Sequence, residues 1–180
     1  MRVPLLLTVL LLPTLYATPY TAFSKAYKAQ QYKKACQIGK TLFANERDEK
    51  FLSLIGHACL KADYIDTLAM VQSRLRSTRQ SRENAVVFSS VLLQKRLIYQ
   101  FMYDDTDLCS FSLPISDHPL SYAFVAIRDK SYRMISTNPK VIEFHRHGIR
   151  YTLSIDRSNR GKITIEADDD NNHTTIHRYL

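Results

Sequence analysis

Residues 54–64 read LIGHACLKADY, and this mixture of small residues with a turn before an aromatic is typical of a tight helical hairpin. Gly56 and Ala58 carry little or no side chain, so a second helix can pack closely against them. Asp63 interrupts the helical run, and Tyr64 opens the next segment. The segment AYKAQQYKKA at residues 26–35 contains a matching alanine and tyrosine 32 positions earlier, which indicates a partner for the first stretch.

The spacing of apolar residues predicts further helices on both sides of this stretch. Residues 20–113 contain no proline and only two glycines, and their apolar residues recur at steps of three and four. Short polar breaks at residues 30–31, 45–48 and 63 predict antiparallel neighbours. Four stripes result: Ala22, Phe23, Ala26 and Tyr27; Ala35, Ile38, Gly39, Leu42 and Phe43; Phe51, Ile55, Ala58, Cys59 and Ala62; and Ile65, Leu68, Ala69, Gln72 and Leu75.

A fifth helix is predicted over residues 83–103, where apolar residues occupy more than one face. It follows the most basic stretch of the chain, SRLRSTRQSREN at residues 73–84, which we expect to link the fourth helix to the fifth. Arginines at this spacing can bind carboxylates or phosphates, although most such runs are solvated linkers.

The composition changes at residue 104, beyond which β-type residues dominate in short runs that are separated by turn residues. The clearest alternation places Ile149, Tyr151, Leu153 and Ile155 on one face of a strand. Strands are predicted over residues 122–127, 132–136, 141–145, 149–155, 162–166 and 174–179. We therefore expect an α+β fold: about five helices in antiparallel hairpins over residues 18–103, then a β-meander of five or six strands over residues 104–180, packed on the last helix.

The helical half resembles tetratricopeptide or Sel1-like repeats, in which a leucine and a glycine precede a small residue and the turn ends at an aromatic. The separations from Ala26 to Ala58 and from Tyr32 to Tyr64 are both 32 residues, close to the repeat of about 34 in this class. An unrelated helical bundle is the alternative. The residues that match the pattern are Leu54, Gly56, Ala58, Ala62, Asp63 and Tyr64, and one repeat earlier Ala26, Tyr32 and Ala35.

Three cysteines, Cys36, Cys59 and Cys109, suggest one pair and one leftover thiol in an oxidising compartment. Spacing alone does not identify the pair. In the hairpin that the resemblance implies, Cys36 lies about ten residues before the turn at 45–48 and Cys59 about eleven after it. The resemblance therefore implies a Cys36–Cys59 disulfide, with two buried thiols as the alternative.

Residues 1–17 have the order of a secretory signal peptide: Arg2, an apolar run over residues 3–12, then Pro13 and a stretch that ends in Ala17. The run is shorter than the roughly 20 apolar residues that span a bilayer. We expect cleavage before Thr18, a periplasmic or secreted protein, and no integral membrane segment after cleavage.

The basic residues are concentrated in the helical half. Residues 18–103 hold 14 Lys and Arg against 6 Asp and Glu, whereas residues 104–180 hold 10 against 11. In an exported protein this excess points to an acidic protein, anionic lipid or polysaccharide rather than to nucleic acid.

The resemblance to tetratricopeptide repeats implies protein–protein interaction, as in adaptor proteins of the bacterial envelope, and no catalysis. We expect the partner, another envelope protein or an acidic or extended peptide, on the concave side of the helices. The candidate partner-binding residues are Tyr27, Lys28, Lys61, Arg74, Arg76, Arg79 and Arg82.

The alternative is an envelope protein that binds a ligand or metal in its β domain. His145 and His147, and likewise His173 and His177, have spacings that place each pair on one face of a strand. Four converging imidazoles could bind zinc, copper or nickel, although exposed histidines on a sheet are common. The chain has no glycine-rich phosphate loop and no nucleophile elbow, so we expect no enzyme activity and no cofactor.

Overall fold

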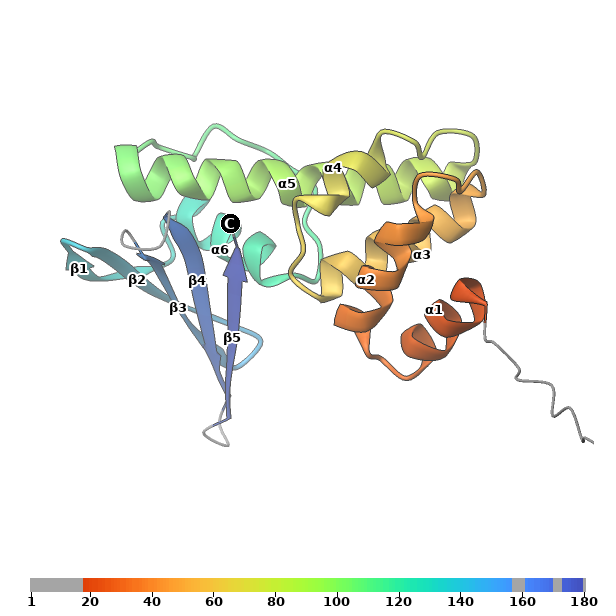
Figure 1. Cartoon of the computed structure of the whole chain (residues 1–180). Coiled ribbons are helices and arrows are strands. Elements are labelled where there is room, and N and C mark those ends of the chain that lie inside the picture. The colour runs from red at the N-terminus through yellow and green to blue at the C-terminus, as the bar shows by residue number, and fades with distance from the viewer. Residues whose placement is uncertain (1–17, 157–160, 170–172, 180) are drawn as a thin grey trace, which may run out of the picture.

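The computed structural model describes residues 18–156, 161–169 and 173–179; the expected signal peptide lies outside them. Helices precede a sheet, which confirms the predicted α+β fold with a C-terminal antiparallel meander (Figure 1). The elements are α1 (Pro19–Lys28), α2 (Tyr32–Leu42), α3 (Glu49–Lys61), α4 (Thr67–Gln72), α5 (Arg79–Asp104), α6 (Pro119–Arg128), β1 (Arg133–Thr137), β2 (Lys140–Arg146), β3 (Ile149–Asp156), β4 (Lys162–Asp168) and β5 (Thr174–Tyr179). Among these described elements, no helix is long and apolar enough to cross a membrane.

Helix α3 is the centre of the helical part, because it packs against α2, α4 and α5. Its contact with α1 is aromatic, with the rings of Phe23 and Phe51 centred 4.8 Å apart. Gly56 allows the close approach of α5, since a Cβ at this position would lie 2.6 Å from Cζ of Phe88. A disulfide between Cys36 and Cys59 joins α2 to α3.

Helix α5 begins at Arg79, four residues earlier than predicted. Its start is set by Thr78, whose Oγ1 accepts a hydrogen bond from the backbone N–H of Ser81 at 3.0 Å. The last six residues of the basic stretch, 79–84, are therefore part of α5.

The prediction of a strand over residues 122–127 is wrong, because this segment belongs to α6. Pro119 is the first residue of the helix, a position where proline needs no N–H, and His118 caps it. The buried residues Leu120, Ala123, Phe124 and Ile127 follow helical spacing. Aromatic and β-branched residues favour strands in isolation, but the cap and the burial of one helical face override that preference.

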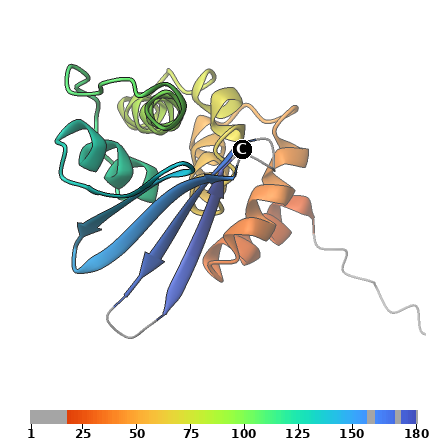
Figure 2. The ribbon, with the colours of Figure 1, turned by 90° about the vertical axis from the view of Figure 1, so that its left-hand side faces the viewer.

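The five strands form one antiparallel sheet in the order β1-β2-β3-β4-β5. Residues of its buried face pair across strands, with Ile142 opposite Leu153 and Leu153 opposite Ile165. The predicted cover was the fifth helix alone, but α6 lies between α5 and the sheet (Figure 2). Tyr122 of α6 meets Tyr151 of β3 with ring centroids 5.8 Å apart. Helix α5 also reaches the sheet end, where Lys140 Nζ donates to the carbonyl oxygen of Phe101 at 2.7 Å.

Candidate partner-binding surface

Three rings from three helices meet at the end of the helical part where α1 turns into α2. Tyr27 of α1, Tyr32 of α2 and His57 of α3 have centroids 5.7 to 5.9 Å apart, and we call them the aromatic platform. Tyr27 Oη lies at hydrogen-bonding distance, 2.9 Å, from His57 Nδ1. The left-handed backbone of Gln30, with φ of 55°, reverses the chain between the two tyrosines.

Two groups of the aromatic platform, His57 and Tyr27, are neutral at pH 7. Burial lowers the pKa of His57, and the positive charge of Lys61 lowers it further. Burial also raises the pKa of Tyr27, and the neighbouring Tyr32 contributes to the same effect. These shifts suit a stacking and hydrogen-bonding surface, because neither group carries charge or holds a mobile proton near neutral pH.

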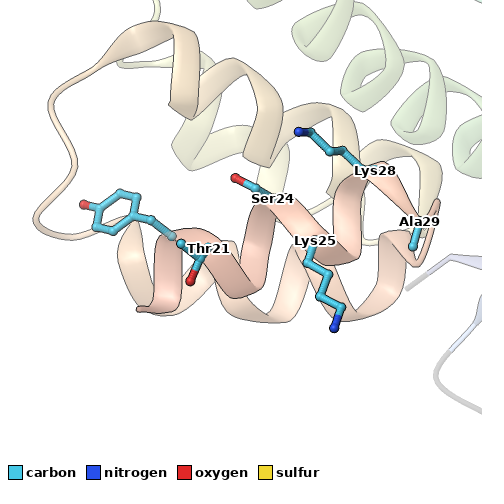
Figure 3. Close-up of a pocket in the computed structure, with 6 residues that line it drawn as sticks. Thr21, Ser24, Lys25, Lys28 and Ala29 are labelled. Atoms are coloured by element: carbon cyan, nitrogen blue, oxygen red, sulfur yellow. The ribbon is translucent and has the colours of Figure 1, made fainter. Parts of the chain in front are cut away.

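The three helices of the aromatic platform also carry five exposed lysines. The lysine surface, as we call it, consists of Lys25, Lys28, Lys33, Lys34 and Lys61, all of which are exposed. One shallow hollow of about 750 Å³ includes Tyr32, Lys33, Lys34 and Lys61 in its lining, together with glutamines such as Gln37. A second, of about 670 Å³, lies along α1 and is lined by Tyr20, Thr21, Ser24, Lys25, Lys28 and Ala29 (Figure 3). Ala29 and Gln30 belong to different hollows, so the two adjoin at the α1–α2 turn.

The charge of the lysine surface is not neutralised within the described part of the chain. Among the residues that the structure describes, no acidic one lines either hollow. Over residues 18–156, 161–169 and 173–179, none of the five ammonium groups lies within 4.0 Å of a carboxylate oxygen. Cations beside half-buried aromatic rings can bind carboxylates or other anionic groups of a partner.

The structure does not bring the arginines of the basic stretch to this surface. Arg74 donates to the carbonyl oxygens of Phe43, at 2.7 Å, and Glu46, beyond the C-terminal end of α2. Tyr32 starts the same helix, and its 11 residues correspond to about 16 Å. Of the predicted partner-binding residues, Tyr27, Lys28 and Lys61 therefore share one end of the helical part, and the four arginines lie near the other.

Most of these arginines bind groups of the chain itself. Arg82 donates to the carbonyl oxygens of Arg76 and Ser77 at 2.9 and 3.2 Å. Arg79 pairs with Glu83 at 2.9 Å. Only Arg76, which is exposed, has a side chain with no such assigned contact in the described structure.

The four histidines of the alternative reading do not converge. Strands β2 and β5 are separated by β3 and β4, which places His145 about 14 Å across the sheet from His177. His147 does not share the strand of His145, because it lies in the following turn with φ of 53°. His177 instead contacts Asp63, at 2.9 Å. No cluster of three or more His, Cys, Asp or Glu side chains in the described ranges could hold a metal ion.

The sequence patterns did not indicate that His57 belongs to the aromatic platform. His57 lies within the stretch LIGHACLKADY and precedes Lys61 by four positions, so both occupy one face of α3. It also follows Tyr27 by 30 positions, close to one repeat of the proposed pattern. Comparison with protein-family models, curated proteins and solved structures found no match to this chain.

Proposed function

We propose that this protein is a non-catalytic interaction scaffold of the bacterial envelope, exported through its N-terminal segment. Its helical part is tetratricopeptide-like, and its lysine surface binds an acidic or extended segment of another envelope protein. The aromatic platform supplies rigid apolar contact area, and the lysines supply charge complementarity and a fast approach of the partner.

The packing of α1 to α5 supports a repeat-like scaffold. Each helix packs against the next along the chain, and α3 also packs against α5, as in stacked helical hairpins. The turn residues Ala62, Asp63 and Tyr64 end one hairpin helix, with Asp63 in a left-handed conformation at φ 62°. This arrangement presents α1, α2 and α3 side by side at the aromatic platform.

The single observation that carries the proposal is the lysine surface, which has no carboxylate partner within the described ranges and lies on the same helices as three half-buried rings. Five cations without carboxylate partners repel one another and leave a positive potential, which an acidic partner relieves. A basic face that is only solvated would not need an aromatic centre.

Capture from envelope extract tests the proposal. Tagged protein carrying Lys28→Glu and Lys61→Glu should retain at least tenfold less partner than the wild type. The control carries Lys130→Glu and Arg178→Glu, which change the net charge equally on exposed residues outside the lysine surface, and it should retain the partner. Equal retention by both variants would contradict the proposal. If no protein is captured, and the Lys28→Glu and Lys61→Glu variant instead loses binding to vesicles of anionic lipid, the surface binds lipid and not a protein.

A further inference from the structure

A partly buried polar cluster joins the helical part to the rest of the molecule, and the proposed function does not use it. It consists of Asp63 in the turn after α3, His118 at the start of α6, and His177 and Tyr179 of β5. Strand β5 is the sheet edge nearest the helices α2 and α3 (Figures 1 and 2). Its members come from positions up to 116 residues apart, so the cluster exists only in the folded chain.

The carboxylate of Asp63 is the centre of this cluster. Its Oδ2 lies 2.9 Å from Nδ1 of His177, and its Oδ1 lies 3.7 Å from Nε2 of His118. Tyr179 is only 1% exposed, and its ring lies 5.8 Å from that of His118. The Tyr179 hydroxyl has no hydrogen-bonding partner within the described ranges, and the charge of Asp63 raises the pKa of Tyr179 in addition to burial.

The cap of α6 determines which ring nitrogen of the neutral His118 carries the proton. Its Nδ1 accepts a hydrogen bond from the backbone N–H of Leu120 at 3.2 Å, which caps α6. A ring nitrogen that accepts carries no proton, so the proton of the neutral imidazole is on Nε2, toward Asp63. Nε2 is buried, and no hydrogen bond satisfies it among the described residues.

A second proton on His118 is incompatible with this arrangement. The second proton must bind Nδ1, which then becomes a donor and can no longer accept the hydrogen bond from the N–H of Leu120. The cap of α6 is thereby lost. The second proton would also place a full positive charge on a side chain that is 3% exposed. The groups that face His118 are Asp63 and Lys61 from the end of α3, the carbonyl of Leu60, and His177 and Tyr179 from β5.

We propose that these four residues form a proton-operated latch, the Asp63 latch, which holds α6 and β5 to the helical part near neutral pH and releases them when His118 is protonated. A proton from solvent binds the Nδ1 lone pair and forms an N–H bond, and no other covalent bond forms or breaks. Burial lowers the pKa of His118 to about 4, with Asp63 opposing this effect and His177 and Lys61 adding to it, so release belongs to the acidic range. The latch shares Lys61 with the lysine surface, but it needs no partner bound there.

Hydrogen exchange of the full chain between pH 7 and pH 4, corrected for the intrinsic exchange rate, tests the latch. The wild type should lose at least tenfold protection in residues 119–128 and 174–179, reversibly and more than in the disulfide-linked α2 and α3. His118→Asn keeps a capping side chain but cannot titrate, so these segments should change less than threefold. Equal losses in the wild type and His118→Asn would overturn the latch.

Asp63→Asn provides a second test, because asparagine tolerates the left-handed backbone at this position. It removes the negative charge, so protection of α6 and β5 should already be low at pH 7. If protection matches that of the wild type at pH 7, Asp63 does not hold these segments. Should His118→Asn fail to fold, NMR titration of the wild-type His118 ring decides: loss of β5 protection while the ring is neutral contradicts the latch.

Discussion

The hydroxyl of Tyr27 lies 2.9 Å from Nδ1 of His57, 30 positions further along the chain. This contact ties α1 to α3, while the disulfide ties α2 to α3. The three helices that carry the lysine surface are thereby fixed to one another, so partner binding at this surface requires little ordering of the protein.

Because Lys61 lies near His57, replacing Lys61 should change the pKa of His57 measurably. Lys61→Gln removes a nearby positive charge, so the pKa should rise, while burial still keeps it below the ordinary value. Lys33→Gln is the matched control, since Lys33 is not among the causes of the shift. NMR titration of the His57 ring measures both, and an unchanged pKa in Lys61→Gln would place Lys61 away from the platform.

Removal of the disulfide should destabilise the protein. Cys36 and Cys59 are 23 positions apart, and closing a loop of this length contributes about 3 kcal/mol through the entropy of the unfolded chain. Urea unfolding of Cys36→Ala/Cys59→Ala should show a loss of this size relative to the wild type. Cys109→Ser is the control, because Cys109 is free and exposed, and it should shift the midpoint little. A similar loss in both variants would argue against a stabilising bridge.

Gly56→Ala should overpack the contact between α3 and α5. The new Cβ would meet the ring of Phe88 and lie 3.0 Å from Cγ1 of Val71, which requires the helices to shift. Overpacking of this kind costs about 1–3 kcal/mol. Phe88→Leu in the same chain should reduce the effect of Gly56→Ala, which a double-mutant cycle in urea unfolding measures. Additive effects would mean that the two positions do not touch.

The buried His118 predicts that stability falls on acidification. Its pKa is about 4 in the folded state and 6.5 in the unfolded chain, so between these values the unfolded state binds more protons. The free energy of unfolding should therefore decrease by about 3 kcal/mol as pH falls from about 6.5 to about 4. The quantity to compare is this decrease in the wild type and in His118→Asn, and the same decrease in both would exclude His118 as its source.

The sequence alone predicted the elements that have strong periodicity. The stripes of the first four helices and five of the six predicted strands correspond to elements of the structure. The exception was α6, whose start depends on the His118 cap and whose residues individually favour strands. The local sequence pattern predicts the type of element where buried residues recur with the period of a helix or a strand. It fails where a capping residue decides whether a helix forms.

The candidate sites depend on contacts that spacing does not contain. Tyr27 and Lys61 were predicted at the partner surface, but Arg74 was separated from them because it binds carbonyl oxygens near the other end of α2. The Asp63 latch could not be predicted, since Asp63, His118 and His177 come from three distant segments. His177 was predicted beside other histidines, and its neighbour is a carboxylate from the helical part.

Site-specific photocrosslinking in living cells tests the binding surface most directly. A photoreactive amino acid replaces Gln37, which is exposed and lines the hollow with Lys61, or Ile176, which is 42% exposed on β5. We expect a discrete protein adduct from position 37 that disappears when Lys28→Glu and Lys61→Glu are added, and no adduct from position 176. An adduct from position 176 with none from position 37 would contradict this expectation and move the binding site to the sheet.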